Sequence, residues 1–521
     1  MLERETKTFP EFTRSDARIS ELLDHLHQIA DLQALGAIAE WDQNTAMPGG
    51  AAEVRGFQVA ALQGIIHELW TNPRLGNLLR ELQEPVQQAV FTDADRGLVR
   101  EALRAHERAT KLPRKLVEEL AHVQATSFEA WRSAREHSDF ARFAPMLSRT
   151  ITLRREVADH LGFAETRYDA LLDEYEPGMT SSKLDRLFTP VREASRSLLQ
   201  RIEASGNTID ASFLEGSFPA EQQIALCEHL LHNMGYDFSR GQMAQSPHPF
   251  TTSFGSPFDV RLTVRPLENF LQAALMAAIH EGGHAVYEQG VAPTLVRKLL
   301  ASGASSGAHE SQSRLWENAI GRAEPYWQGQ FAAVKEAFPT QFAHTDIPIF
   351  VRALNKVQPS LIRVEADEVT YNLHIIVRYE LEKSLINGDI AVETLPGLWN
   401  AKYREYLGIE PANDAEGVLQ DIHWSFGFGY FPTYTLGNLY SAQIFHKLHV
   451  VFPDLDQRLA GGDTAFVLEW LREHMYTFGV IYLPEALIER ITNEPPNPEH
   501  FTRYLNSKFE KIYGLPTKNA A

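Results

Sequence analysis

Two histidines and a glutamate near the middle of the 521-residue chain have the spacing of a metal-dependent hydrolase. His280, Glu281 and His284 form a His-Glu-x-x-His pattern within a long apolar run. One helical turn separates the two imidazoles, so both project from one face of a helix and can bind the same metal ion. Glu281 lies beside them and can accept a proton from a water molecule that the metal activates. The pattern therefore predicts zinc-dependent hydrolysis.

The residues around this pattern predict that it is buried. Residues 266–287 carry apolar side chains at the repeat of a helix that is covered on most sides. A buried histidine more often forms a plain hydrogen bond than binds metal, but two at this spacing with an acid between them are costly to bury. Gly282 and Gly283 each cost about 1 kcal/mol relative to alanine inside a helix. We expect substrate or another stretch of backbone to come close to them.

A catalytic zinc ion usually has three protein ligands and one open position for water. Glu288 continues the same helix, and its carboxylate is expected to point along the helix axis instead of over the metal. After a Ser/Gly-rich loop, a second helix is predicted to begin near residue 309. We predict Glu310, in the first turn of this helix, as the third ligand, and His309 is the competing candidate.

The rest of the chain is predicted to be mostly helical. Apolar residues recur at helical spacing in segments 15–40, 96–111, 116–137, 181–203 and 221–234. The clearest strand signal is residues 250–264, where Gly255, Ser256 and Pro257 separate two short strand-like runs and predict a hairpin before the zinc helix. An edge strand there could hold a peptide by backbone hydrogen bonds, and an ordinary supporting hairpin fits the sequence equally well.

Composition excludes several classes of protein. The chain has 49 basic and 68 acidic residues and a formal net charge of −19, which argues against a nucleic-acid surface. Its one cysteine, Cys227, can form no internal disulfide and lies in an apolar helical stretch, far from the zinc motif. The first residues form no apolar signal region, and no apolar run has the length of a membrane span. We therefore expect a cytoplasmic protein without membrane attachment.

Several further motifs carry a family resemblance. The chain resembles the thermostable carboxypeptidases, the carboxypeptidase Taq-like metallocarboxypeptidases of peptidase family M32. The matching motifs, besides the zinc helix, are His-Pro-Phe at 248–250, Asp-x-Arg-x-Thr at 259–263, His-Glu-Ser-Gln at 309–312, Ile-Arg-x-x-Ala-Asp at 362–367 and Gly-x-x-Gln-Asp-x-His-Trp at 417–424. Residues 41–48 are also similar to a stretch of such proteins, so the likeness covers most of the chain.

The resemblance implies a fold and an activity. It implies a large, mostly α, two-lobed fold with a deep active-site groove, similar to neurolysin and angiotensin-converting enzyme. We expect a single catalytic domain over residues 1–521 with its zinc-binding core at about residues 245–440. The family implies a zinc carboxypeptidase that acts on peptides with a free C-terminus, has broad specificity, releases proline poorly and forms a homodimer. One zinc ion per chain is expected, with cobalt as a possible substitute.

Late residues are candidates for binding the substrate. The aromatic and Gly-rich stretch 423–434 could supply donors to the scissile carbonyl, and similar helical zinc peptidases favour His423 and Tyr434 in it. Tyr434 could equally be a packed aromatic residue. A carboxypeptidase also needs a fixed cation for the C-terminal carboxylate, a task that suits an arginine. From periodicity, Arg363 pairs with Asp367, whereas the resemblance implies that Arg363 binds substrate.

The remaining candidates and the competing functions are as follows. The predicted substrate-binding residues besides Arg363 are Arg261, the second candidate for the carboxylate, Gln420 for the peptide backbone, and His248. An oligopeptidase or dipeptidyl carboxypeptidase would use the same zinc chemistry with a differently placed anchor. A non-catalytic helical protein with a structural metal is the third possibility, but a structural zinc site usually has a fourth protein ligand, commonly cysteine.

Overall fold

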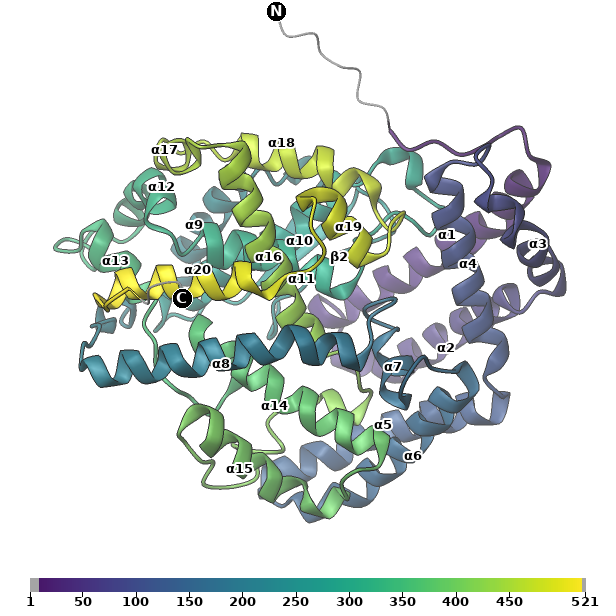
Figure 1. The fold of residues 1–521 in the computed structure, drawn as a ribbon, viewed down its shortest axis with the longest axis horizontal. Helices are drawn as coiled ribbons and strands as arrows, with labels where there is room; N and C mark the ends of the chain where they lie inside the picture. Colours follow the sequence, from purple (N-terminus) through teal and green to yellow (C-terminus); the bar gives the residue numbers. More distant parts are fainter. Residues whose placement is uncertain (1–8, 518–521) are drawn as a thin grey trace, which may run out of the picture. The chain divides into compact units, whose positions relative to one another are not determined.

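The protein is built from α-helices and one small sheet. The structure is a computed structural model that describes residues 9–517. Within these residues, twenty α-helices and a three-stranded sheet are joined by turns and short helical segments (Figure 1). The predicted mostly helical fold with a small β element is confirmed. The likeness to neurolysin and angiotensin-converting enzyme stays a prediction, and residues 1–8, where no signal is expected, lie outside the described part.

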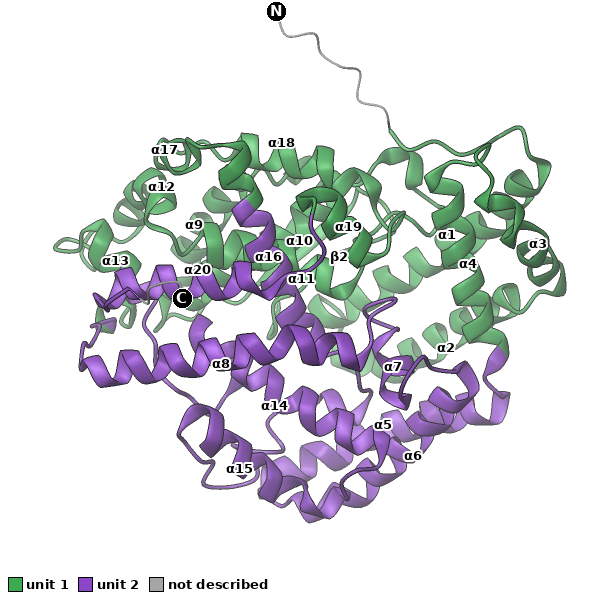
Figure 2. Cartoon of the chain, in the orientation of Figure 1, with its two compact units in different colours: residues 1–110, 212–351, 447–493 green, residues 111–211, 352–446, 494–521 purple. Residues whose placement is uncertain are grey.

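The chain forms two compact units, which Figure 2 colours separately. Unit 1 contains residues 1–110, 212–351 and 447–493, and unit 2 contains residues 111–211, 352–446 and 494–521. Each unit is assembled from three separate stretches of sequence. No single linker divides them, which is why the sequence contains no obvious boundary.

Unit 1 holds the predicted zinc helix and the sheet. Its helices and strands are α1 (Ala17–Thr45), α2 (Ala52–Trp70), α3 (Pro73–Gln83), α4 (Asp93–Lys111), α9 (Ala220–Met234), β1 (Gly241–Gln245), β2 (Thr251–Ser253), β3 (Val260–Val264), α10 (Leu271–Gly290), α11 (Ser306–Arg314), α12 (Glu324–Ala337), α17 (Leu455–Ala460), α18 (Ala465–His474) and α19 (Pro484–Thr492). Most of α13 (Ile347–Leu354) belongs to this unit as well.

Within the described residues, the regular elements of unit 2 are all helices. It contains α5 (Arg114–His137), α6 (Ala144–Leu161), α7 (Arg167–Leu172), α8 (Ser181–Ser205), α14 (Glu368–Asn387), α15 (Leu395–Leu407), most of α16 (Pro432–Val451) and α20 (Pro498–Tyr513).

The predicted helices are all present, with shifted ends. Helix α1 begins at Ala17, where the Asp16 carboxylate, and not Ser15, caps it by accepting a 2.8 Å hydrogen bond from the Arg18 N–H. The zinc helix begins at Leu271, later than residue 266, and it continues to Gly290. Apolar residues continue at helical spacing beyond a helix end when the flanking residues are also buried. The end of the helix is set instead by the residue that caps its backbone groups.

The sheet has the strand order β1-β3-β2. Strand β2 pairs antiparallel with β3, as the predicted hairpin requires, and β1 pairs parallel with β3 on its other side. Strand β1 was not predicted, because its sequence has neither β-branched residues nor a clear alternation of apolar and polar side chains. Val260 and Leu262 of β3 are fully buried. They anchor the sheet within the core of unit 1.

Close helix packing explains the two glycines of the zinc helix. A Cβ atom at Gly282 would lie 2.7 Å from the Leu231 side chain of α9, and one at Gly283 would lie 2.6 Å from the backbone oxygen of Gln312 in α11. Figure 1 shows α9, α10 and α11 together in this unit. The expected close approach of another backbone is therefore confirmed at Gly283, and it brings α11 against the His-Glu-x-x-His face.

None of the helices within residues 9–517 has both the length and the apolar character that a bilayer crossing requires. Cys227 is a buried free thiol in α9.

Candidate metal centre

Three side chains of unit 1 converge on one point. His280 and His284 lie one turn apart on α10, and Glu310 lies on α11. The Glu310 Oε2 atom is 3.7 Å from His280 Nε2 and 3.5 Å from His284 Nε2. The three ligand atoms all lie within 4.8 Å of one another. The structure thus brings together the three residues that the sequence predicts as metal ligands.

The distances fit a divalent ion. Two ligand atoms bound at the usual 2.0–2.1 Å to a tetrahedral zinc ion lie about 3.3 Å apart, close to the separations seen here. Glu310 is buried, and both histidine side chains are largely covered. Two neutral imidazoles and one carboxylate are a common ligand set of catalytic zinc sites, which leave a further position open. These residues can therefore hold a metal ion without rearrangement.

A carboxylate orients the first histidine. The Nδ1 atom of His280 lies 2.9 Å from Glu317 Oε2, which leaves Nε2 directed at the metal position. Arg314 and Arg322 donate to the same carboxylate at 3.3 and 3.0 Å. Glu317 lies in a segment of π-helix, Leu315–Ile320, that continues α11. Such wider turns are frequent at functional sites, and this one places Glu317 beneath His280.

A further histidine, His309, orients His284. His284 Nδ1 lies 2.5 Å from His309 Nδ1, and His309 Nε2 lies 2.8 Å from Glu288 Oε1. If His284 Nε2 binds the metal, its Nδ1–H donates to His309, which then donates its own Nε2–H to Glu288. His309, the competing candidate for third ligand, is thus positioned behind His284 and outside the group of three converging atoms.

Glu310, the third predicted ligand, is held as an anion. Arg314 donates to Glu310 Oε1 at 2.6 Å, and the Ser313 hydroxyl donates to Oε2 at 3.0 Å. Burial alone would raise the pKa of Glu310, but the charge of Arg314 and the proximity of His280 outweigh it and hold the pKa well below its usual value. A deprotonated carboxylate is the form that binds metal.

Glu281 is arranged differently from the other acids. It is 6% exposed, and its Oε2 accepts a 2.8 Å hydrogen bond from the Thr251 hydroxyl of β2. Burial raises the pKa of its carboxyl above the usual value, although His280 and Thr251 act in the opposite direction. A carboxylate with raised proton affinity, next to the ligands but not among them, suits a general base.

Two further predicted residues of unit 1 lie near the sheet. Arg261 of β3 forms a two-pronged ion pair with Asp259, at 2.8 and 2.7 Å, and stacks over Phe254. His248 is exposed in the loop between β1 and β2. The roles predicted for both in substrate binding stay predictions.

Unit 2 gathers the other predicted residues around Asp421. Arg363 Nε donates to Asp421 Oδ1 at 2.9 Å, and Arg378 Nε donates to Oδ2 at 2.6 Å. Burial would raise the pKa of Asp421, but Arg363 and Arg378 hold it well below its usual value. Two guanidinium groups share this one carboxylate, so the cluster carries a net positive charge.

Arg363 does not pair with Asp367. It lies in a short 3₁₀ turn, Arg363–Glu365, and α14 begins only at Glu368. The Asp367 carboxylate caps α14 by accepting from the Val369 and Thr370 N–H groups. The ion pair expected from helical periodicity is therefore wrong, because the two residues do not lie on one helix.

Gln420, His423 and Tyr434 surround this cluster. The Gln420 Oε1 accepts a 3.0 Å hydrogen bond from the Arg363 N–H, and its Nε2 donates to the Leu361 carbonyl at 2.9 Å. The Tyr434 ring lies 5.2 Å from the Arg363 guanidinium. Burial lowers the pKa of His423 to about 4, with Asp421 acting in the opposite direction. His423 is therefore neutral at physiological pH.

Sequence reasoning missed the groups that support the ligands. Arg314 and Glu317 follow Glu310 at helical spacing, so a search for charged partners along this helix could have found them. Asp421 and Arg378 lie on segments far apart in the sequence, and nothing local connects them.

A buried His-Glu-x-x-His helix with a carboxylate from the next helix defines the site as that of a metallopeptidase. The family model described as "Carboxypeptidase Taq (M32) metallopeptidase" matches residues 21–509. The chain belongs to this family of carboxypeptidases, and it is accordingly an enzyme, a metallopeptidase hydrolase.

Individual relatives are similar to this chain over almost its whole length. "Thermostable carboxypeptidase 1" of Thermus thermophilus is 41% identical over 511 residues, which cover 96% of this chain and 99% of the relative. "Carboxypeptidase 1" of Bacillus subtilis is 39% identical, with 95% and 98% covered. The crystal structure of the M32 carboxypeptidase from Deinococcus radiodurans superimposes with a TM-score of 0.92 at 36% identity, covering 96% of this chain and all (100%) of that one.

Proposed function

We propose that the enzyme is a zinc-dependent carboxypeptidase that removes residues one at a time from the free C-terminus of peptides. The observation that carries this proposal is the convergence of His280 Nε2, His284 Nε2 and Glu310 Oε2 beside the buried Glu281. Zinc is the proposed ion because its usual catalytic site consists of three nitrogen and oxygen ligands with one open position. Cobalt is proposed as a functional substitute.

The protein groups divide the chemistry between them. A bound zinc ion would polarise the scissile carbonyl and increase the acidity of the attacking water. Glu281 accepts a proton from that water on its carboxylate and later transfers it to the nitrogen of the leaving amino acid. Thr251 fixes the Glu281 carboxylate through its 2.8 Å hydrogen bond. Glu317 and the His309–Glu288 pair keep the two histidine rings oriented.

Arg363 is the proposed anchor for the C-terminal carboxylate of the substrate. The net positive charge that it shares with Arg378 and Asp421 supports this assignment, because a second carboxylate would balance the cluster. Gln420 holds the Arg363 backbone and is proposed to contact the peptide as well. Arg261 and His248 are proposed as further substrate-binding residues.

His423 and Tyr434 are proposed to donate hydrogen bonds to the carbonyl oxygen as negative charge develops on it. A neutral His423 can donate a hydrogen bond without placing an extra charge in the site. The family likeness further supports a homodimer, broad specificity with poor release of proline, and one catalytic domain over the full chain with its zinc-binding core at about residues 245–440. The net charge and the single cysteine support a cytoplasmic location.

Mass spectrometry of a single peptide tests the proposal. The peptide is incubated with the enzyme once with a free C-terminus and once with an amidated one. We expect a ladder of single-residue losses from the free peptide and little turnover of the amide. Undiminished cleavage of the amide would favour an oligopeptidase, and losses of two residues at a time would favour a dipeptidyl carboxypeptidase. Chelation should stop the reaction, and added zinc should restore it.

A further inference from the structure

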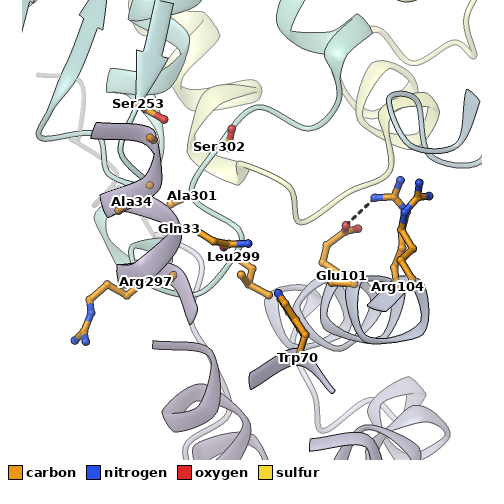
Figure 3. A pocket seen from close by; sticks show the side chains of 15 residues that line it. Gln33, Ala34, Trp70, Glu101, Arg104, Ser253, Arg297, Leu299, Ala301 and Ser302 are labelled. Carbon is orange, nitrogen blue, oxygen red and sulfur yellow. Dashed lines mark ion pairs between the residues drawn. The ribbon is translucent and has the colours of Figure 1, made fainter. Parts of the chain in front are cut away.

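A cavity of unit 1 lies beside strand β2. Its volume is about 450 Å³, within the range of sites that bind small molecules or peptide segments. Helices α1, α2 and α4 line it together with the end of β2 and the loop at residues 297–302. Figure 3 shows Trp70, Glu101 and Arg104 on one side of the cavity, and Ser253 and Ser302 on another.

The cavity is connected to the metal centre through the side chains of β2. The Thr251 hydroxyl binds Glu281, and the Ser253 hydroxyl donates to Glu288 Oε2 at 2.7 Å. Ser302, on the same side of the cavity as Ser253, donates to Oε1 of the same Glu288 carboxylate at 3.0 Å. Glu288 in turn holds His309 behind the ligand His284. Ser253 and Ser302 therefore line the cavity and also hold Glu288, which supports the metal centre.

Strand β2 offers a track from the metal centre to this cavity. Thr263 donates its N–H to the Phe250 carbonyl, so this pair is hydrogen-bonded across the hairpin. Bonded and non-bonded pairs alternate in an antiparallel ladder, so the N–H and C=O groups of Thr251 and Ser253 point away from β3. Because β2 is the edge strand of the sheet, an extended peptide can pair with these groups on the side of β2 opposite β3.

The length of the substrate on each side of the cut decides which part reaches the cavity. Ser253 lies two strand residues, or about 6.7 Å, beyond Thr251, which marks the position of the general base. A carboxypeptidase substrate has one residue after the scissile bond, which extends the chain by about 3.4 Å. The single residue after the scissile bond is therefore too short to pass Ser253. Only the part of the peptide on the N-terminal side of the scissile bond, the upstream part, is long enough.

The lining of the cavity favours acidic side chains. Glu101, Arg104 and Arg108 lie on one face of α4, and Arg297 lines the cavity from the loop. Glu101 already receives a 2.8 Å hydrogen bond from Arg100, outside the cavity, and lies 3.6 Å from Arg104. Arg297 is held in a two-pronged ion pair with Asp31, at 2.8 and 2.5 Å. Arg104 and Arg108 are therefore the two cationic side chains that α4 places on the lining. The small side chains of Ala30, Ala34 and Ala37 leave the space open.

We propose that this cavity is an upstream substrate subsite, which rests on the proposed carboxypeptidase function. It receives the third and fourth residues from the C-terminus of the peptide and prefers glutamate or aspartate there. Arg104 and Arg108 supply this preference. The preference would oppose the overall charge of −19, which repels acidic peptides, so general electrostatic attraction cannot produce it.

Matched peptides test the subsite. Three peptides share one C-terminal residue and differ only at the third and fourth positions from the C-terminus, which are both glutamate, both glutamine or both lysine. The measurement is kcat/KM for release of the common C-terminal residue, at low salt. We expect the glutamate peptide to exceed the lysine peptide by roughly three- to tenfold, as for a partly exposed charge pair.

Charge reversal provides the decisive comparison. Arg104→Glu and Arg108→Glu should each reduce or invert the preference, mainly through KM, while the glutamine peptide changes little. Arg104→Lys keeps the charge and should retain the preference, which separates an electrostatic role from a loss of folding. Arg74→Gln, at an exposed ion pair on α3, is the matched control and should behave as the wild type.

The outcomes distinguish a failure of the subsite proposal from a failure of the proposed carboxypeptidase function. Release of the C-terminal residue at equal rates from all three peptides would overturn the subsite and leave the carboxypeptidase intact. A glutamate preference that persists in both charge-reversed variants would also overturn it. Release from none of the peptides would instead contradict the proposed function itself.

Discussion

The metal centre of unit 1 and the arginine cluster of unit 2 are built in different ways. The predicted ligands His280, His284 and Glu310 lie within one continuous segment, and Arg314 and Glu317 follow Glu310 at helical spacing. In unit 2, Asp421 joins Arg363 and Arg378 from separate stretches of the chain. The first arrangement can be identified from a short motif, whereas the second exists only once the chain has folded.

The two regions also differ in how charge is balanced. Around the metal position, the carboxylates of Glu310, Glu317 and Glu281 can compensate a divalent cation. In unit 2, two arginines share one carboxylate. One region therefore carries the charges that suit a cation, and the other carries the charges that suit an anion.

The largest expected effect is that of Glu281→Gln in unit 1. We predict that kcat falls by about 10²- to 10⁴-fold, because the variant lacks the proton acceptor. Zinc binding should be unchanged, since Glu281 is not among the converging ligand atoms. Steady-state kinetics together with elemental analysis checks both statements. A variant that keeps its activity would remove Glu281 from the mechanism.

The comparable change in unit 2 is Asp421→Asn. Removal of one member of a buried ion pair typically costs about 3–5 kcal/mol, because the remaining charge stays buried. We therefore predict a large loss of unfolding free energy in urea, together with a raised KM for peptides if the fold persists. Lys383→Met, which removes a surface ion pair with Asp185 in the same unit, is the control and should cost about 1 kcal/mol or less. Equal losses of unfolding free energy in the two variants would show that the Asp421 cluster stabilises the protein no more than a surface ion pair does.

The buried His423 makes unit 2 sensitive to acid. Its pKa is about 4 in the folded protein and about 6.5 in an unfolded chain, so below pH 6.5 the unfolded chain takes up the proton first. The stability associated with the neutral ring is fully present above pH 6.5 and is lost as the pH falls toward 4. We predict that wild type loses about 3 kcal/mol more than His423→Gln over this interval. If urea unfolding gives wild type and His423→Gln the same dependence of unfolding free energy on pH, the lowered pKa of His423 is contradicted.

The smallest expected effect concerns the outer contacts of the metal centre. His309→Asn removes the acceptor that orients His284, and we predict a 10- to 100-fold loss of zinc affinity in a chelator competition. Ser302→Ala removes one of several donors to Glu288 and should change the affinity by less than about threefold. If His309→Asn leaves zinc affinity intact, His284 is oriented by other contacts.

The sequence was sufficient to predict the three converging residues, because the histidine spacing and the next helix are local features. It also predicted the helical fold and the β2–β3 hairpin. Strand β1 was missed, since the Gly241–Gln245 segment gains its strand conformation from pairing with β3 and has no strand propensity of its own.

The misassigned partner of Arg363 has a related cause. Spacing suggested Asp367, but the preference of aspartate for the helix N-cap places that carboxylate on the backbone of α14. The contact with Asp421 depends on how the segments of unit 2 pack, which periodicity cannot reveal. Glu288 shows the same limit at the metal centre, because its place one turn beyond His284 did not reveal that it supports His309.

Anomalous diffraction at the zinc edge, from crystals grown with added metal, tests the central claim most directly. We predict one strong peak at about 2.0–2.2 Å from His280 Nε2, His284 Nε2 and a Glu310 oxygen, with no fourth protein ligand. A peak away from these three atoms, or one whose remaining position is closed by another side chain, would contradict the account.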